Sequence, residues 1–106
     1  MAVTRYHNID GSSKSIVELI APFSGVTDIK SIVITPKSTT GTPQVELFIQ
    51  KPTSTGTDKF SIINGVEIPV GASLVLDDKD VFITKQFGLY IKLDSNSTAD
   101  ILINLS

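Results

Sequence analysis

The feature that most constrains the fold of this 106-residue chain is the spacing of its apolar residues, which recur at every second position. Near the end of the sequence, Ile101, Ile103 and Leu105 alternate with the polar Asp100 and Asn104. A period of two is typical of a β-strand with one buried face, whereas a helix repeats its apolar residues every three or four positions. Because no long stretch carries the helical pattern, the sequence predicts an all-β fold.

Short apolar runs of this kind recur along the chain, with Gly, Pro, Asn, Asp and Ser between them. Asn64-Gly65 separates two of the runs and predicts a type I′ hairpin turn, because this dipeptide tolerates positive φ angles. About eight or nine strands are expected from ten such runs, some of them very short. The runs lie at residues 2–9, 14–21, 29–35, 44–50, 59–63, 66–68, 73–76, 81–85, 89–93 and 99–105.

Strands at this spacing predict a single antiparallel β-sandwich, jelly-roll-like, that occupies residues 1–106. Two packed antiparallel sheets are favoured over a parallel sheet because the strands alternate between apolar and polar residues. Residues 1–9 are expected to form either an edge strand or an N-terminal arm exchanged with a neighbouring subunit.

Charge and cysteine content narrow the classes of function. The 9 Lys and Arg residues nearly balance the 11 Asp and Glu residues, which gives a net charge of −2. Such a chain lacks the basic surface that binds nucleic acid or anionic membranes, so neither is expected as a partner. The absence of cysteine excludes disulfides and thiolate chemistry within the chain. The first residues form no apolar run, so we expect no signal peptide and synthesis in a cytoplasm.

Residues suited to catalysis or metal binding are few. His7 is the only histidine, and a position near one end of the chain is a poor place to hold a Ser–His–Asp geometry. The acidic run Asp77, Asp78 and Asp80 suggests a calcium loop, but Lys79 interrupts it and no bidentate glutamate follows at the expected place. We therefore favour a solvated turn over a metal site, and we expect neither a cofactor nor enzymatic activity.

Apolar residues in otherwise polar positions are the most informative about function. Phe48, Tyr90 and Leu102 each occupy the polar side of an alternating strand. We expect these three side chains to form one exposed patch, because patches of this kind mark contact sites. The sequence leaves open two alternatives: an incidental set of exposed side chains, or strands whose inner and outer faces are assigned the wrong way round. Tyr6 is a fourth interface candidate, and uncovered edge strands would add further contacts.

The order of several segments carries a resemblance to a known class of protein. The segments are a strand at 28–34, a Ser/Thr/Gly loop, a strand at 45–49, a second loop, an Ile-Pro-x-Gly-x-Ser-Leu junction within 66–76, and alternating strands at 89–93 and 101–105. In this order the chain resembles small structural proteins of tailed phages, including those of marine hosts, that decorate the head or belong to the neck or tail. Residues 77–84 depart from that pattern, because a more hydrophobic strand is expected there.

The resemblance implies a non-enzymatic component of a virion that binds copies of itself and other virion proteins. It brings no catalytic residues to carry over. The alternative is a carbohydrate- or receptor-binding module that uses the loops at 37–43 and 52–58. Those loops lack the aromatic residues on which sugars stack, so subunit contacts are the favoured function.

Overall fold

Every regular element in the described part of the chain is a β-strand, as the period-two pattern predicts. The computed structural model describes residues 3–10, 16–23, 29–37, 44–69, 71–77, 86–93 and 98–105. The eight strands there are β1 (Val3–Asp10), β2 (Ile16–Ile20), β3 (Ile29–Pro36), β4 (Gln44–Thr53), β5 (Gly56–Glu67), β6 (Leu74–Asp77), β7 (Gly88–Leu93) and β8 (Thr98–Leu105). The strand predicted at 81–85 lies outside the described residues. No helix among those residues is long and apolar enough to cross a membrane.

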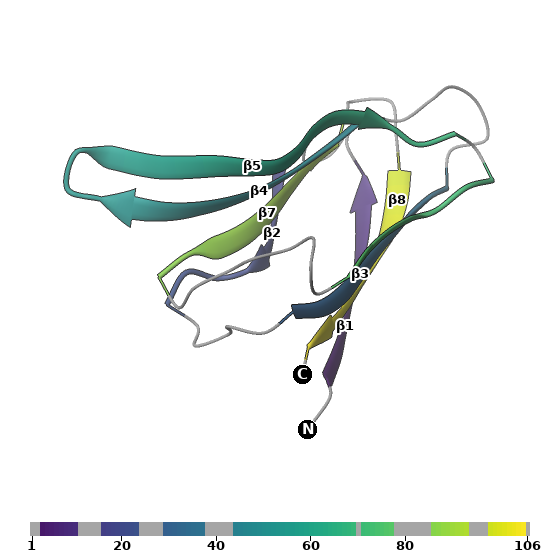
Figure 1. Cartoon of the computed structure of the whole chain (residues 1–106), viewed down its shortest axis with the longest axis horizontal. Coiled ribbons are helices and arrows are strands. Elements are labelled where there is room, and N and C mark those ends of the chain that lie inside the picture. The colour runs from purple at the N-terminus through teal and green to yellow at the C-terminus, as the bar shows by residue number, and fades with distance from the viewer. Residues whose placement is uncertain are drawn as a thin grey trace.

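The eight strands form two antiparallel sheets of four strands each, which confirms the predicted β-sandwich (Figure 1). The first sheet has the order β1-β8-β3-β6 and the second has the order β2-β7-β4-β5. Strands pair symmetrically about the middle of the chain: β1 with β8, β2 with β7, β3 with β6 and β4 with β5. The chain therefore passes from one sheet to the other at every step except the β4–β5 hairpin.

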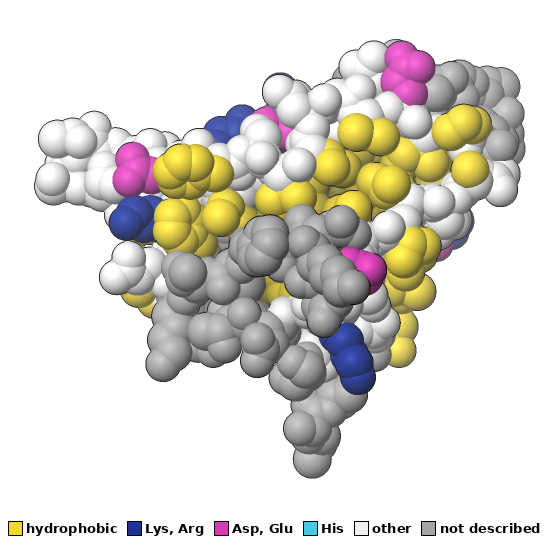
Figure 2. Space-filling model, viewed as in Figure 1, with side chains coloured by type: hydrophobic (Ala, Val, Ile, Leu, Met, Phe, Trp, Pro, Cys, Tyr) yellow, Lys and Arg dark blue, Asp and Glu magenta, His cyan; other side chains and the backbone are white. Residues whose placement is uncertain are grey.

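The core lies between the two sheets and is built from one side of each alternating strand. In β8, Ile101 and Ile103 are fully buried, and in β7 Leu89 and Ile91 are fully buried opposite them. Burial of one such side chain contributes about 1.5–3 kcal/mol to folding, so this alternation is the main source of stability. Further hydrophobic side chains form a band between β5 and β6, where the core reaches the side of the sandwich (Figure 2).

The prediction of a hairpin turn at Asn64-Gly65 is wrong, because β5 continues through this dipeptide to Glu67. Val45 pairs with Val66 and Leu47 pairs with Ile63, so β5 has one more residue than β4 over this interval. That extra residue is a β-bulge, and Gly65 supplies the positive φ, 70°, that such a bulge requires. The sequence signal for a positive φ angle is therefore real, but it bends a strand rather than reversing the chain.

The segment predicted as a polar loop at 52–58 is instead the end of a long β4–β5 hairpin. Thr53 pairs with Gly56, and the chain reverses at the two residues between them. Strand β7 reaches only as far as the pair of Gln50 with Gly88. Beyond that pair, β4 and β5 continue as an exposed two-stranded ribbon that projects from the sandwich (Figure 1).

Candidate protein-contact surface

The four interface candidates lie on two opposite outer faces of the sandwich. Phe48 and Tyr90 are on β4 and β7 of the second sheet, whereas Tyr6 and Leu102 are on β1 and β8 of the first. The single patch predicted for Phe48, Tyr90 and Leu102 is therefore wrong. All three do point away from the core, but alternation within a strand does not reveal which sheet the strand joins.

On the outer face of the second sheet, polar side chains cover the aromatic residues, and we refer to this surface as the covered face. Phe48 is only 2% exposed although it points outward. Its ring stacks on Tyr90 with centroids 5.6 Å apart, and the ammonium group of Lys59 lies 4.2 Å from the Phe48 centroid. The Tyr90 hydroxyl donates a hydrogen bond of 3.1 Å to Glu18. Long polar side chains from neighbouring strands thus close this face around its apolar centre.

The ionisable groups around Phe48 and Tyr90 have partners within the chain. Glu46 accepts a hydrogen bond of 2.9 Å from Ser61 and forms an ion pair of 3.0 Å with Lys59. The hydrogen bond from Lys59 lowers the pKa of Glu46, although partial burial opposes the shift and the bond from Ser61 supports it. Burial raises the pKa of the Tyr90 hydroxyl, and its bond to Glu18 raises it further. These groups are engaged within the chain rather than presented to a ligand.

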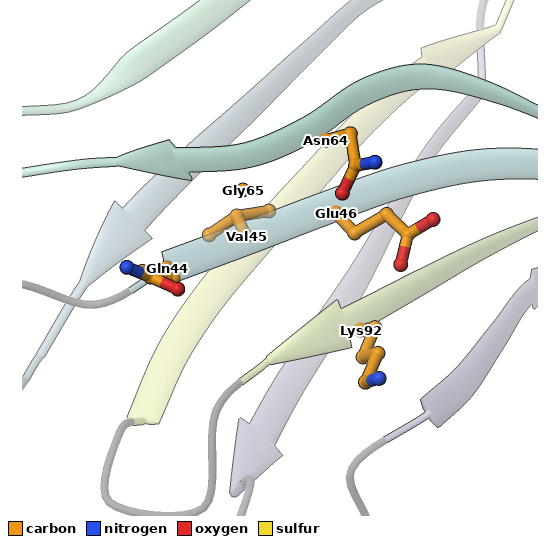
Figure 3. A pocket seen from close by; sticks show the side chains of 6 residues that line it. All are labelled: Gln44, Val45, Glu46, Asn64, Gly65 and Lys92. Carbon is orange, nitrogen blue, oxygen red and sulfur yellow. The ribbon is translucent and has the colours of Figure 1, made fainter.

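A small hollow lies on the covered face where Glu46, Asn64 and Lys92 converge from β4, β5 and β7 (Figure 3). Its volume is about 150 Å³. Binding sites for small molecules generally have volumes of about 300–1,000 Å³. The hollow is therefore too small for an organic ligand of ordinary size.

The outer face of the first sheet is different, because a row of apolar residues crosses all four of its strands. Tyr6 pairs with Leu102, Leu102 with Val33, and Val33 with Val75. Tyr6 is 73% exposed and Val75 is 60% exposed, while Leu102 and Val33 between them are partly exposed. We refer to these four residues as the apolar stripe and to the surface that carries them as the striped face.

Short polar side chains lie on each side of the apolar stripe and bond to one another. On one side, Asn104 donates a hydrogen bond of 2.8 Å to Ser31. On the other side, Asn8 donates to Asp100, and the hydroxyls of Thr35 and Ser73 are 2.9 Å apart. A partner that covered these groups would not leave them without hydrogen bonds, because each already has a partner within the sheet.

A hollow of about 380 Å³ lies beside the stripe on this face. Tyr6 and Leu102 form part of its wall, together with Asn8, Thr35 and Asp100. Beside the hollow, Lys37 forms an ion pair of 3.6 Å with Asp100 at an exposed site, where such pairs contribute little. The striped face therefore combines an exposed apolar centre with a recess and a weakly charged surround.

The sheet edges are less suited to docking than this face. Strand β5 carries register shifts at two places along its pairing with β4, β2 carries one along its pairing with β7, and β6 is only four residues long. Strand β1 turns Arg5 and His7 toward the core side, since these residues pair with the buried Ile103 and Ile101. Bulges, short strands and inward charges are the features by which edges avoid recruiting other chains. Contact through a face is therefore favoured over contact through an edge.

The candidate catalytic and metal-binding residues are only partly covered by the structure. His7 has a buried Nε2 atom with no hydrogen-bond partner among the described residues, and burial, followed by the charge of Arg5, lowers its pKa. Asp77 ends β6 opposite Ser31, whereas Asp78 and Asp80 lie outside the described residues. Within the described part, His, Asp and Glu side chains do not gather in groups of three or more that could hold a metal ion.

Sequence reasoning missed two members of the stripe, Val33 and Val75. Each lies between two core residues in a run that is apolar throughout, so neither stands out as an apolar residue in a polar position. The two residues become recognisable as part of the stripe only when the register places them beside Leu102.

Comparison with other proteins adds nothing to this assignment, since no protein-family model and no curated protein sequence matches the chain.

Proposed function

We propose that this chain is a non-enzymatic structural component of a phage particle and that it acts through protein–protein contacts made by the striped face. The observation that carries the proposal is the apolar stripe, in which Tyr6 and Val75 are more than half exposed at the two ends of one continuous row. Contiguous apolar surface rimmed by polar residues is characteristic of sites that bind another protein.

The order of the strands supports a role in a particle. A first sheet in the order β1-β8-β3-β6 that packs on a second in the order β2-β7-β4-β5 fits the winding of a jelly roll. This architecture occurs in viral capsid domains and also in lectins and cupins. Fold alone does not assign a function, so the phage assignment depends on the resemblance in segment order together with the exposed stripe.

The alternative of a carbohydrate- or receptor-binding module receives less support. Of its two candidate loops, residues 38–43 lie outside the described residues, and residues 52–58 form the exposed end of the two-stranded ribbon. Ligand sites are generally concave and lined by aromatic and apolar side chains. A narrow ribbon of Thr, Ser, Gly and Pro does not provide such a surface.

Immuno-electron microscopy tests this function. The sample is phage particles purified from a culture in which the chain is produced. We expect antibodies against the chain to label intact particles at regular positions. A chain with Tyr6→Glu should be incorporated at least about tenfold less, because it places a charge in an apolar contact. Ser54→Glu, at the exposed turn of the ribbon, is the matched control and should be incorporated normally. Particles that lack the chain would contradict the proposal.

A further inference from the structure

We infer that the occupant of the striped face is a second copy of this chain, packed face to face about a two-fold axis that runs along the strands. This inference rests on the proposed function and adds the partner and its register. Rotation about such an axis reverses the strand order, so β1 of one copy lies over β6 of the other and β8 lies over β3. Tyr6 then faces Val75 of the second copy, and Leu102 faces Val33.

The sizes of the stripe residues favour this register. The larger side chains, Tyr6 and Leu102, are on β1 and β8, and the smaller ones, Val33 and Val75, are on β3 and β6. When the order is reversed, each large side chain meets a small one, which keeps the two sheets at a uniform separation of about 10 Å. A two-fold axis along the stripe would instead place Tyr6 against itself and Val75 against itself, which would wedge the sheets apart at one end.

Charge opposes the approach of two identical faces only weakly, although Asp77 and Asp100 both lie on the striped face. In the reversed register Asp100 lies opposite the hydroxyl of Thr35 in the second copy, because β8 covers β3 and the two residues share a row. Asp100 is also partly neutralised by Lys37 at 3.6 Å. The whole chain has a net charge of only −2, so repulsion between copies is small.

The area of the face is close to the smallest that specific interfaces bury. Four strands spaced about 4.8 Å apart, with up to eight residues of about 3.3 Å each, cover roughly 500 Å². Two copies would together bury on the order of 1,000 Å², which is near the lower limit for a specific interface. We therefore expect a reversible dimer whose population depends on concentration.

Sedimentation velocity with charge-bearing variants tests both the partner and the register. Wild-type protein should shift from monomer to dimer between roughly 1 μM and 500 μM, as expected for an interface of this size. Tyr6→Glu and Val75→Lys should each weaken the dimer at least about tenfold, since each places an unpaired charge against an apolar residue. Both positions are exposed, so the variants are expected to fold, which circular dichroism would verify.

An equimolar mixture of the two variants is the decisive sample. The new carboxylate of one chain then faces the new ammonium group of the other, and the heterodimer should form where neither variant dimerises alone. Failure of the mixture to dimerise would overturn the register, and a wild-type chain that stays monomeric would overturn the partner. If wild type is monomeric while Tyr6→Glu still prevents incorporation into particles, the inference fails and the proposed function stands. If the chain dimerises but is absent from particles, the proposed function fails and the dimer contact stands.

Discussion

The two outer faces of the sandwich carry similar apolar centres but expose them very differently. On the covered face Phe48 is 2% exposed, whereas on the striped face Tyr6 is 73% exposed. The difference lies in the neighbours, because Lys59 extends across the ring of Phe48, while Tyr6 and Leu102 are flanked by short side chains such as Asn8 and Ser31. An outward apolar residue is thus available for contact only where no long side chain on the next strand can cover it.

The largest expected effect comes from truncating the aromatic residue of each face. Phe48→Ala should destabilise the monomer by about 3 kcal/mol, because it removes a buried ring and its stack on Tyr90. Tyr6→Ala should change monomer stability by less than about 0.5 kcal/mol, as expected for an exposed position without special contacts. Urea unfolding in dilute solution measures both values. Equal losses for the two variants would remove the distinction between the faces.

The cover over Phe48 is tested by shortening Lys59. Lys59→Ala should destabilise the protein by about 1 kcal/mol, since it removes the cation over the ring and an ion pair that is partly exposed to solvent. Lys59→Met retains the apolar stem and should lose less. The charge-dependent part of the loss should shrink at high salt. If Lys59→Ala unfolds at the same urea concentration as wild type, the side chain does not stabilise this face.

A lysine that covers an apolar residue can also be introduced on the striped face. Ser31 lies on the strand next to Leu102 and Asp100, one row from Leu102 and two rows from Asp100. Lys59 is placed in the same way relative to Phe48 and Glu46. Ser31→Lys should therefore extend over Leu102 toward Asp100 and weaken the dimer by roughly fivefold, or on the order of 1 kcal/mol. Ser31→Ala removes the same hydrogen bond to Asn104 without adding a cover, and it should dimerise much like wild type. Equal dimer constants for the two variants would show that a cover has no effect.

The smallest expected effect is a pH dependence confined to the covered face. Because the pKa of Glu46 is lower in the folded state than in the unfolded chain, its contribution is complete above its ordinary value of 4.5 and is lost as the pH falls below it. Glu46→Gln should be less stable than wild type at pH 7 and should lose less stability between pH 5 and pH 3. Urea unfolding across this range measures the slopes, and parallel slopes would contradict the lowered pKa.

Much of the fold follows from the sequence because alternation fixes which side of a strand is buried. Ile101, Ile103 and Leu105 enter the core as their spacing predicts, and the two antiparallel sheets follow from many short strands. The grouping of outer residues does not follow, because it depends on which strands pair across long stretches of chain. Phe48 and Leu102 look equivalent in sequence, yet the winding of the chain places them on opposite faces.

Local signals can also be correct while their structural outcome differs. Asn64-Gly65 does supply a positive φ angle at Gly65, but the flanking residues already have partners on β4, so the result is a bulge. Likewise, Lys59 reads as an ordinary surface residue until its position over Phe48 is known. Such a contact is made between side chains on different strands, so the alternation of residues within one strand does not predict it.

The most direct test of the account uses the two tyrosines of the chain, which lie one on each face. Nuclear magnetic resonance of protein labelled with carbon-13 only in its tyrosine rings, followed over about a hundredfold dilution, reports on both faces in one sample. If the striped face is the contact surface, the ring signals of Tyr6 shift with concentration while those of Tyr90 stay constant. Signals of Tyr90 that shift while those of Tyr6 stay constant, or no shift of either residue in a sample that sedimentation shows to associate, would contradict it.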